Sequence, residues 1–152
     1  MIFKFLITFS LIIYSSSSFS EKIIEGKAII IDGDTIHIDK NKIRLHGIDA
    51  PEITQTCRIE DEIWNCGKES SANLKKLISK KNIKCEVNDI DRYKRYVAEC
   101  YVNNININQY MVRQGWAIAY KYYSILYIED EEIAKKHKLG IWEGRFVEPY
   151  LF

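Results

Sequence analysis

The side chains that could act on a phosphodiester bond are concentrated in residues 31–52. Asp34 follows an Asp-Gly turn, and Arg44 lies in an alternating strand pattern. Asp49 and Glu52 flank a proline. Carboxylate and carbonyl oxygens suit a hard divalent cation such as Ca²⁺, and the fork of an arginine matches phosphodiester oxygens. The combination indicates phosphodiester cleavage, although simply solvated surface carboxylates would give the same composition.

Short β-strands joined by tight turns are expected to position these side chains. Residues 23–31 are rich in isoleucine, and apolar residues alternate with polar ones at 36–38 and 43–45. A period of two places Arg44 on the face opposite its apolar neighbours, so its side chain is presented to a surface or cleft. Pro51 has no N–H to donate to a sheet, and the strand is expected to end before it.

Residue patterns after Pro51 predict, in order, a polar loop, a helix, two strands around a turn, and two further helices. These elements are expected at residues 53–65, 67–80, 82–88, 96–102, 106–115 and 129–138. Five strands with a helix between the third and fourth predict the α+β class and an OB-fold, a five-stranded β-barrel, here with three helices. The fold alone does not decide the function.

The N-terminus has the pattern of a secretory signal peptide. One early lysine is followed by an apolar run and then by small residues, so we expect a signal peptide at residues 1–20 and one domain at residues 21–152. An uncleaved membrane anchor is the alternative. A membrane span needs about 20 apolar residues, and this run is interrupted by Thr8 and Ser10. The expected protein is secreted or periplasmic, without stable membrane association after cleavage.

The charge of the chain gives little general attraction to nucleic acid. The chain has 22 Lys and Arg residues and 21 Asp and Glu residues, and cleavage of the signal peptide would remove Lys4. The mature chain is therefore formally neutral, and a polyanion would have to bind through local charge. Lysines at residues 75–84 and the basic residues of the turn at 89–95 are the candidates. A solvated helix face explains the first group equally well.

Four cysteines follow the signal peptide, and an even number in an oxidising compartment favours two disulfides. Cys85 and Cys100 have their midpoint in the predicted turn at 89–95, so they lie opposite each other in an antiparallel hairpin. We therefore predict that Cys85 pairs with Cys100 and Cys57 with Cys66. Structural zinc is the rival interpretation, but there is no C-x-x-C pair and the three histidines are scattered.

Three segments, IDGDTI, RLHGIDAPE and DRYKRYVAEC, resemble in order the signature segments of the staphylococcal-nuclease-like (thermonuclease) family. VRQGWA and LGIW extend the resemblance, which covers residues 23–142. The resemblance implies an OB-fold barrel with three helices. It also implies a Ca²⁺-dependent endonuclease that hydrolyses DNA and RNA with little sequence preference and leaves 3′-phosphate ends.

The resemblance assigns the metal and the base. Asp34 and Asp49 correspond to the carboxylates that bind calcium, with the backbone carbonyl of Ala50 as a further ligand. The best-known member of the family has threonine in place of Ala50, but a carbonyl ligand does not depend on the side chain. Glu52 corresponds to the proposed general base, which takes a proton from the attacking water and reaches the metal through water.

The resemblance also assigns two arginines to the phosphate. Arg44 and Arg95 match the residues that hold it and stabilise the charge of the transition state, for which a permanently protonated fork is suited. The family commonly has glycine in place of Lys94, which directly precedes Arg95. Glycine permits a positive φ that lysine adopts less readily, so the orientation of Arg95 is less certain than that of Arg44.

Substrate contacts are expected from Arg92 and from three tyrosines. Tyr93, Tyr120 and Tyr122 resemble the family's tyrosines that contact a base and the terminal phosphate. Stacking on tyrosine tolerates any base, which suits a nuclease with little sequence preference.

The sequence thus predicts a secreted, monomeric, Ca²⁺-dependent nuclease. A non-catalytic OB-fold module that binds nucleic acid is the first rival, and the joint presence of Asp34, Arg44, Asp49, Glu52 and Arg95 argues against it. An exported structural protein stabilised by disulfides is the second rival, and it would leave that set of residues without a purpose.

Overall fold

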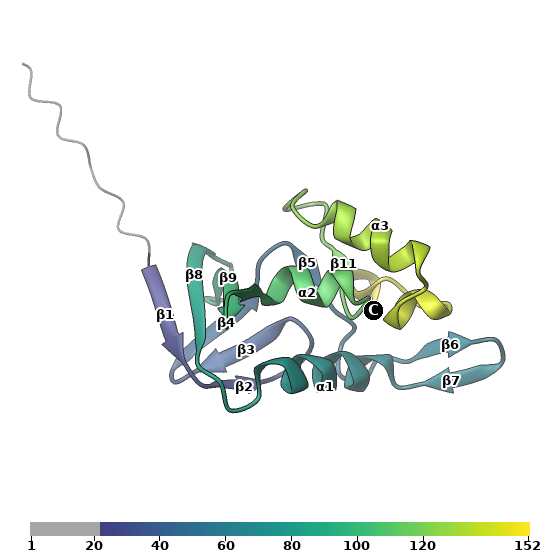
Figure 1. Cartoon of the computed structure of the whole chain (residues 1–152), viewed down its shortest axis with the longest axis horizontal. Coiled ribbons are helices and arrows are strands. Elements are labelled where there is room, and N and C mark those ends of the chain that lie inside the picture. Colours follow the sequence, from purple (N-terminus) through teal and green to yellow (C-terminus); the bar gives the residue numbers. More distant parts are fainter. Residues whose placement is uncertain (1–21) are drawn as a thin grey trace, which may run out of the picture.

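The computed structural model describes residues 22–152, so the predicted signal peptide at residues 1–20 lies outside the described part of the chain (Figure 1). The strands are β1 (Lys22–Gly26), β2 (Ala28–Ile30), β3 (Thr35–Ile38), β4 (Asn41–Leu45), β5 (Ile48–Asp49), β6 (Cys57–Ile59), β7 (Glu62–Trp64), β8 (Ile83–Ile90), β9 (Tyr96–Val102), β10 (Ile105–Asn106) and β11 (Ile118–Ala119). The helices are α1 (Cys66–Ile78), α2 (Ile107–Arg113) and α3 (Ile128–Lys136), followed by the 3₁₀ turns η1 (Gly140–Glu143) and η2 (Pro149–Leu151). Within residues 22–152, no helix is both long and apolar enough to cross a membrane.

The main sheet has the strand order β1-β8-β9-β4-β3-β2, with β10 added to β9. Its two ends, β1 and β2, are separated along the chain by Lys27 alone, so one run of chain joins both ends of the sheet and curls it into a barrel. Counted as one strand, this run gives five strands in the OB-fold order, with α1 between the third and fourth. The predicted fold class is confirmed.

The strand expected over residues 23–31 is bent sharply in its middle. Gly26 has φ +156°, and a Cβ atom there would lie 2.8 Å from Cγ2 of Ile38. A glycine at such a corner lets the strand leave β8 and pair with β3, because no side chain blocks the close approach. The prediction of one continuous strand was therefore incomplete at this corner.

Alternating side chains fill the barrel. Ile43 and Leu45 are fully buried, whereas Arg44 between them lies on the opposite face with its side chain 16% exposed, as the period of two predicted. Leu74 of α1 and Met111 of α2 are also fully buried in the same core. Side chains on the outer face at the end of β4 are therefore held by a rigid apolar scaffold.

The prediction of a loop at residues 53–65 is wrong, because this segment contains the hairpin of β6 and β7. Cys57 lies opposite Trp64 in this hairpin, and the disulfide from Cys57 to Cys66 connects its base to the start of α1. The strands were not recognisable because Ile63, their most apolar outward residue, is 63% exposed and no alternating buried face exists. The hairpin extends beyond the N-terminal end of α1 (Figure 1).

Both predicted disulfides are present. Cys85 lies directly opposite Cys100 in the antiparallel pair of β8 and β9, with their Cα atoms 4.1 Å apart. The register stays constant from this pair up to Val87 and shifts only at a bulge before Asp89. The pairing predicted from the shared midpoint of the two cysteines is therefore confirmed.

Removal of the inner disulfide should lower the stability of the fold. The Cys85→Ala/Cys100→Ala variant loses a cross-link between residues 15 apart in sequence, which the chain-entropy model values at about 3 kcal/mol. Denaturant unfolding of the two proteins should show that loss. The matched Cys57→Ala/Cys66→Ala variant opens a shorter loop and should lose about 2.5 kcal/mol. Undiminished stability of the first variant would contradict the prediction.

Candidate active site

Two buried aspartates and one arginine form the centre of the site. Asp34 and Asp49 are 5% and 8% exposed, and Arg44 forms ion pairs with both. Its Nη2 atom lies 2.6 Å from Oδ1 of Asp49, and its Nη1 atom contacts Oδ2 of Asp34. The sheet explains this meeting, because Thr35, the residue after Asp34, lies opposite Arg44 in the pair of β3 and β4.

The backbone of neighbouring turns fixes the carboxylate of Asp34. The N–H of Ala50 donates to its Oδ2 atom at 2.6 Å, and the hydroxyl of Thr35 donates to Oδ1 at 3.1 Å. The N–H of Asp34 donates to Oδ1 of Asp32 at 3.0 Å, so Asp32 forms the turn that the sequence indicated. Asp34 is therefore held by residues of the turn before β3 and of the segment after β5.

Helix α1 presses against both of these segments. A Cβ atom on Gly33 would lie 2.0 Å from Oγ of Ser70, and one on Gly67 would lie 1.7 Å from the carbonyl oxygen of Glu52. Only glycine fits at either contact, because no real Cβ approaches so closely. The first turns of α1 thus set the distance between the Asp34 turn and the Glu52 segment.

Glu52 has a fixed backbone and an exposed side chain. Its N–H donates to Oε1 of Gln55 at 3.3 Å, and its carbonyl accepts from the N–H of Gln55 at 2.8 Å. Gln55 is fully buried, and its Nε2 atom donates to the carbonyl of Val147 at 2.6 Å. The charge of Glu52 contributes to the pKa of Asp49, so the two carboxylates lie within electrostatic reach of each other.

Negative charge is in excess around the single arginine. Burial and then Asp34 raise the pKa of Asp49, against the opposing effect of Arg44, to about 6. Burial and then Asp34 raise the pKa of Asp32 to about 7. Burial alone would lower the pKa of Arg44, but Asp34 and Asp49 outweigh it and the pKa lies above its ordinary value.

One carboxylate oxygen at this centre has no partner. Oδ2 of Asp49 is buried and accepts no hydrogen bond from any residue in the described part of the chain. A buried carboxylate oxygen normally has a donor or a cation beside it. Residues 22–152 contain no group of three or more His, Cys, Asp or Glu side chains arranged to hold a metal. A cation here would therefore take most of its ligands from backbone carbonyls, water or substrate.

Arg95 lies in the turn between β8 and β9 and binds within that turn. Its Nε atom donates to Oδ2 of Asp91 at 2.8 Å, and its N–H donates to Oδ1 of the same residue. Lys94 has φ +61°, so lysine does adopt the conformation for which the family has glycine. Arg44 lies beside Val97 in the parallel pair of β4 and β9, so Arg95, two residues before Val97, starts from the same face as Arg44.

The tyrosines expected to bind substrate lie in two places. Tyr93 is exposed, with the guanidinium carbons of Arg92 and Arg95 at 4.8 and 5.4 Å from its ring centre. Tyr120 follows β11, which pairs with β5, and its N–H donates to the carbonyl of Gly47 at 2.9 Å. Burial and then Asp49 raise the pKa of Tyr120, which places this tyrosine beside the aspartate centre.

Three tyrosines surround Tyr120, and two of them, Tyr123 and Tyr150, were not predicted from the sequence. The ring of Tyr122 lies 5.8 Å from that of Tyr120, as expected for a shared cluster. Tyr123 lies 5.1 Å from Tyr120, and Tyr150 of the C-terminal segment stacks on it at 5.9 Å. The only sequence feature that pointed to Tyr123 was its position next to the predicted Tyr120 and Tyr122. Tyr150 had no local signal, because it reaches the cluster through a long-range contact.

The raised pKa values give the metal-free protein a characteristic dependence of stability on pH. The carboxyl groups of Asp32 and Asp49 bind protons more tightly in the folded state, so their contribution to the free energy of unfolding is greatest below pH about 4. It should decline as the pH rises to about 7. Denaturant titrations in chelator should show a weaker decline for Asp49→Asn than for the wild type. A steeper decline in the variant would contradict this origin.

Comparison with known proteins gives a consistent family. Residues 42–144 match the family described as Staphylococcal nuclease homologue. The chain is 34% identical to the succinoglycan biosynthesis protein ExoI of Rhizobium meliloti, over 79% of this chain and 65% of that protein. It is 35% identical to an uncharacterized endonuclease of Haemophilus influenzae, over 96% of this chain and 83% of that protein. It is 32% identical to the thermonuclease of Staphylococcus intermedius, over 75% and 73% respectively.

The matches cover different shares of the relatives, and the family match covers most of the expected site residues. The chain spans less than two thirds of the length of ExoI and more than two thirds of the other two proteins. Arg44, Asp49, Glu52 and Arg95 lie inside the span that matches the family, while Asp34 precedes it. The match covers more than half of the chain and includes most of the expected site, and the chain belongs to the staphylococcal nuclease family.

Proposed function

We propose that this chain is an exported, Ca²⁺-dependent endonuclease that hydrolyses the phosphodiester bonds of DNA and RNA with little sequence preference. Two of its relatives are named endonuclease and thermonuclease. The observation that carries the proposal is the buried centre of Asp34, Arg44 and Asp49, in which one carboxylate oxygen is unpartnered. Its two disulfides suit an oxidising compartment outside the cytoplasm.

The residues present fit a hard cation. Asp34 and Asp49 would hold Ca²⁺ together with the carbonyl of Ala50, and all of these donors are oxygens, as Ca²⁺ prefers. All four cysteines are in disulfides, so no thiolate competes for a softer metal. Bound Ca²⁺ supplies positive charge that polarises a phosphoryl oxygen. The excess of carboxylates over arginine at this centre supports one further cation.

Arg44 is suited to hold the phosphate while it holds the aspartates. Its guanidinium has five N–H donors, of which the two ion pairs engage one on each terminal nitrogen. The remaining donors can bind phosphate oxygens and stabilise the charge of a five-coordinate transition state. Arg95 starts from the same face, and it would have to leave Asp91 to reach the phosphate.

Glu52 would act as the general base. Its side chain is exposed beside Asp49, while its backbone is fixed through Gln55. The carboxylate would accept a proton as a water oxygen bonds to phosphorus. The bond from phosphorus to the 5′ oxygen then breaks, and that oxygen takes up a proton and leaves a 3′-phosphate. The tyrosine clusters around Tyr93 and Tyr120 would stack bases without selecting among them.

Activity should require calcium. Purified mature protein should degrade DNA and RNA with Ca²⁺ at millimolar concentration or below. It should lose this activity in chelator, because removal of the metal removes the positive charge that would polarise a phosphoryl oxygen. Gel assays with Ca²⁺, with Zn²⁺ alone and with chelator make the comparison. Full activity in chelator or with Zn²⁺ alone would refute the assignment of the metal.

Substitutions should separate chemistry from binding. Glu52→Gln should lower kcat by about 10² to 10⁴ and still bind a nucleotide bisphosphate, because the phosphate is held by other residues. Arg44→Ala should weaken both turnover and binding. Kinetics and calorimetry on the same preparations distinguish the two effects, with the exposed Glu60→Gln as the control for loss of a surface charge. Cleavage by Glu52→Gln at the wild-type rate would show that another group activates the water.

A further inference from the structure

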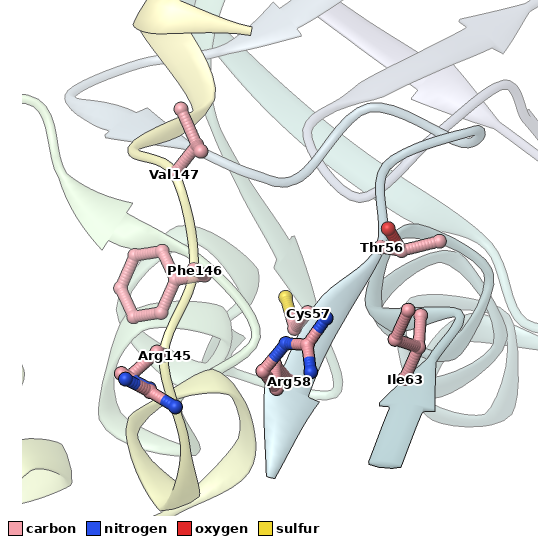
Figure 2. Close-up of a pocket in the computed structure, with 7 residues that line it drawn as sticks. All are labelled: Thr56, Cys57, Arg58, Ile63, Arg145, Phe146 and Val147. Atoms are coloured by element: carbon pink, nitrogen blue, oxygen red, sulfur yellow. The ribbon is translucent and has the colours of Figure 1, made fainter. Parts of the chain in front are cut away.

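A pocket of about 470 Å³ lies between the β6 and β7 hairpin and the C-terminal segment, outside the site described above. Figure 2 shows the residues that line it, with Arg145, Phe146 and Val147 on one side and hairpin residues on the other. The lining residues are Thr56, Cys57, Arg58, Ile63, Arg145, Phe146 and Val147. The C-terminal segment, to which no sequence pattern assigns a role, therefore forms one wall of a pocket.

The two walls are joined by a short backbone ladder that places two arginines opposite each other. The N–H of Arg58 donates to the carbonyl of Arg145 at 2.8 Å, and the N–H of Arg145 donates back at 2.7 Å. A Cβ atom on Gly144 would lie 2.1 Å from the carbonyl oxygen of Arg58, so glycine is needed for this approach. Both side chains are exposed to solvent, and like charges directly opposite each other add no stability to a strand pair.

These two arginines form no ion pair in the described part of the chain. Arg44, Arg95 and Arg113 each form an ion pair with an aspartate, whereas across residues 22–152 neither Arg58 nor Arg145 has one. The lining of the pocket includes no acidic residue. By contrast, the smaller pocket beside Tyr120 is lined by Glu131 and Glu148 as well as by Lys121, which forms an ion pair with Glu131, so the charge of Glu148 there is not offset by a second lysine or arginine of the lining. Of these two pockets, only the one at the hairpin is suited to a negatively charged group.

The rest of the lining is apolar and partly open to solvent. Ile63 is 63% exposed and Val147 is 52% exposed, whereas the ring of Phe146 points away from the hairpin (Figure 2) and packs against Trp142. An apolar surface next to two arginine forks matches a nucleotide, with its phosphate on the arginines and its base against the apolar wall. A free inorganic anion would leave the exposed apolar residues unused.

The pocket adjoins the proposed catalytic segment. Thr56 is four residues after Glu52, so at most about 14 Å of extended chain separates their Cα atoms. Gln55 connects the two sites directly, because it accepts from the N–H of Glu52 and donates to the carbonyl of Val147 in the pocket wall. One nucleic-acid strand of a few nucleotides could therefore occupy both.

We propose that this pocket binds a nucleotide of the substrate strand away from the cleaved bond, with its phosphate held by Arg58 and Arg145. The inference rests on the proposed function, because it takes a polynucleotide as the substrate. Binding at this pocket would make the protein prefer oligonucleotides that are long enough to reach it, without affecting the chemical step.

The test compares a single-stranded 12-mer with a dinucleotide as substrate for an Arg58→Ala/Arg145→Ala variant. KM for the 12-mer should rise about tenfold at low salt, while kcat and the KM for the dinucleotide stay unchanged. The slope of log KM for the 12-mer against log salt concentration should fall by about 0.7 for each phosphate that the variant no longer neutralises. A merely structural role of the two arginines would instead affect both substrates.

Two control variants define the origin of the effect. Lys27→Ala/Lys40→Ala removes the same charge at two exposed positions outside the site and the pocket, and it should leave KM unchanged. Arg58→Lys/Arg145→Lys keeps the charge but not the forked donors, and it should restore the salt slope with only part of the affinity. An equal rise in KM for the Lys27→Ala/Lys40→Ala variant would overturn the inference and leave the proposed nuclease function intact. Wild-type KM on the 12-mer in the Arg58→Ala/Arg145→Ala variant would do the same.

Binding without cleavage separates the two proposals. Fluorescence anisotropy of a labelled 12-mer in chelator measures affinity even if the protein cleaves nothing. If the wild type cleaves neither substrate, the proposed function fails. In that case, weaker binding by the double alanine variant than by wild type still supports the pocket as a nucleic-acid site, and equal or absent binding overturns it.

Discussion

The site depends on one electrostatic arrangement, in which the guanidinium of Arg44 lies between the carboxylates of Asp34 and Asp49. A buried charge is tolerated only when it is paired, and here a single cation faces several carboxylates. The remaining imbalance appears in the raised pKa values and in the unpartnered oxygen of Asp49. The centre is thus kept short of positive charge by the fold itself, which is the condition for binding a further cation and then a phosphate.

Much of the fold could be predicted because inward side chains repeat regularly. The strands around Arg44 and the hairpin of Cys85 and Cys100 have buried faces that alternate with polar residues, and the hairpin register holds from the cysteine pair up to the bulge near its turn. The bend at Gly26 was signalled only by an isolated glycine within an isoleucine-rich run. The β6 and β7 hairpin could not be recognised, because Cys57 is the one buried residue of its two strands and no periodic pattern results.

The candidate site could be predicted where its residues are close in sequence. It was harder to predict where the properties of a residue depend on how the folded chain packs around it. The pair of β3 and β4 brings Asp34 to Arg44, and Asp49 follows five residues after Arg44 and forms an ion pair with it. Asp32 is the turn residue that the sequence indicates, but its raised pKa arises from burial that only the folded chain creates. Lys94 adopts a positive φ because Asp91 accepts three hydrogen bonds from its turn, and these outweigh the cost of that conformation.

The corner at Gly26 also bears on the order of folding. Since β1 and β2 form one run of chain that holds both ends of the sheet, the barrel closes only when Ile24 pairs with Cys85, far along the chain. Such distant pairings cost loop entropy before their packing stabilises the chain, and they therefore slow folding. Cys85 is also the residue whose sulfur joins β8 to β9. If this disulfide forms early, it holds β8 and β9 together before β1 pairs with β8. Oxidation of the two thiols and closure of the barrel therefore both involve β8.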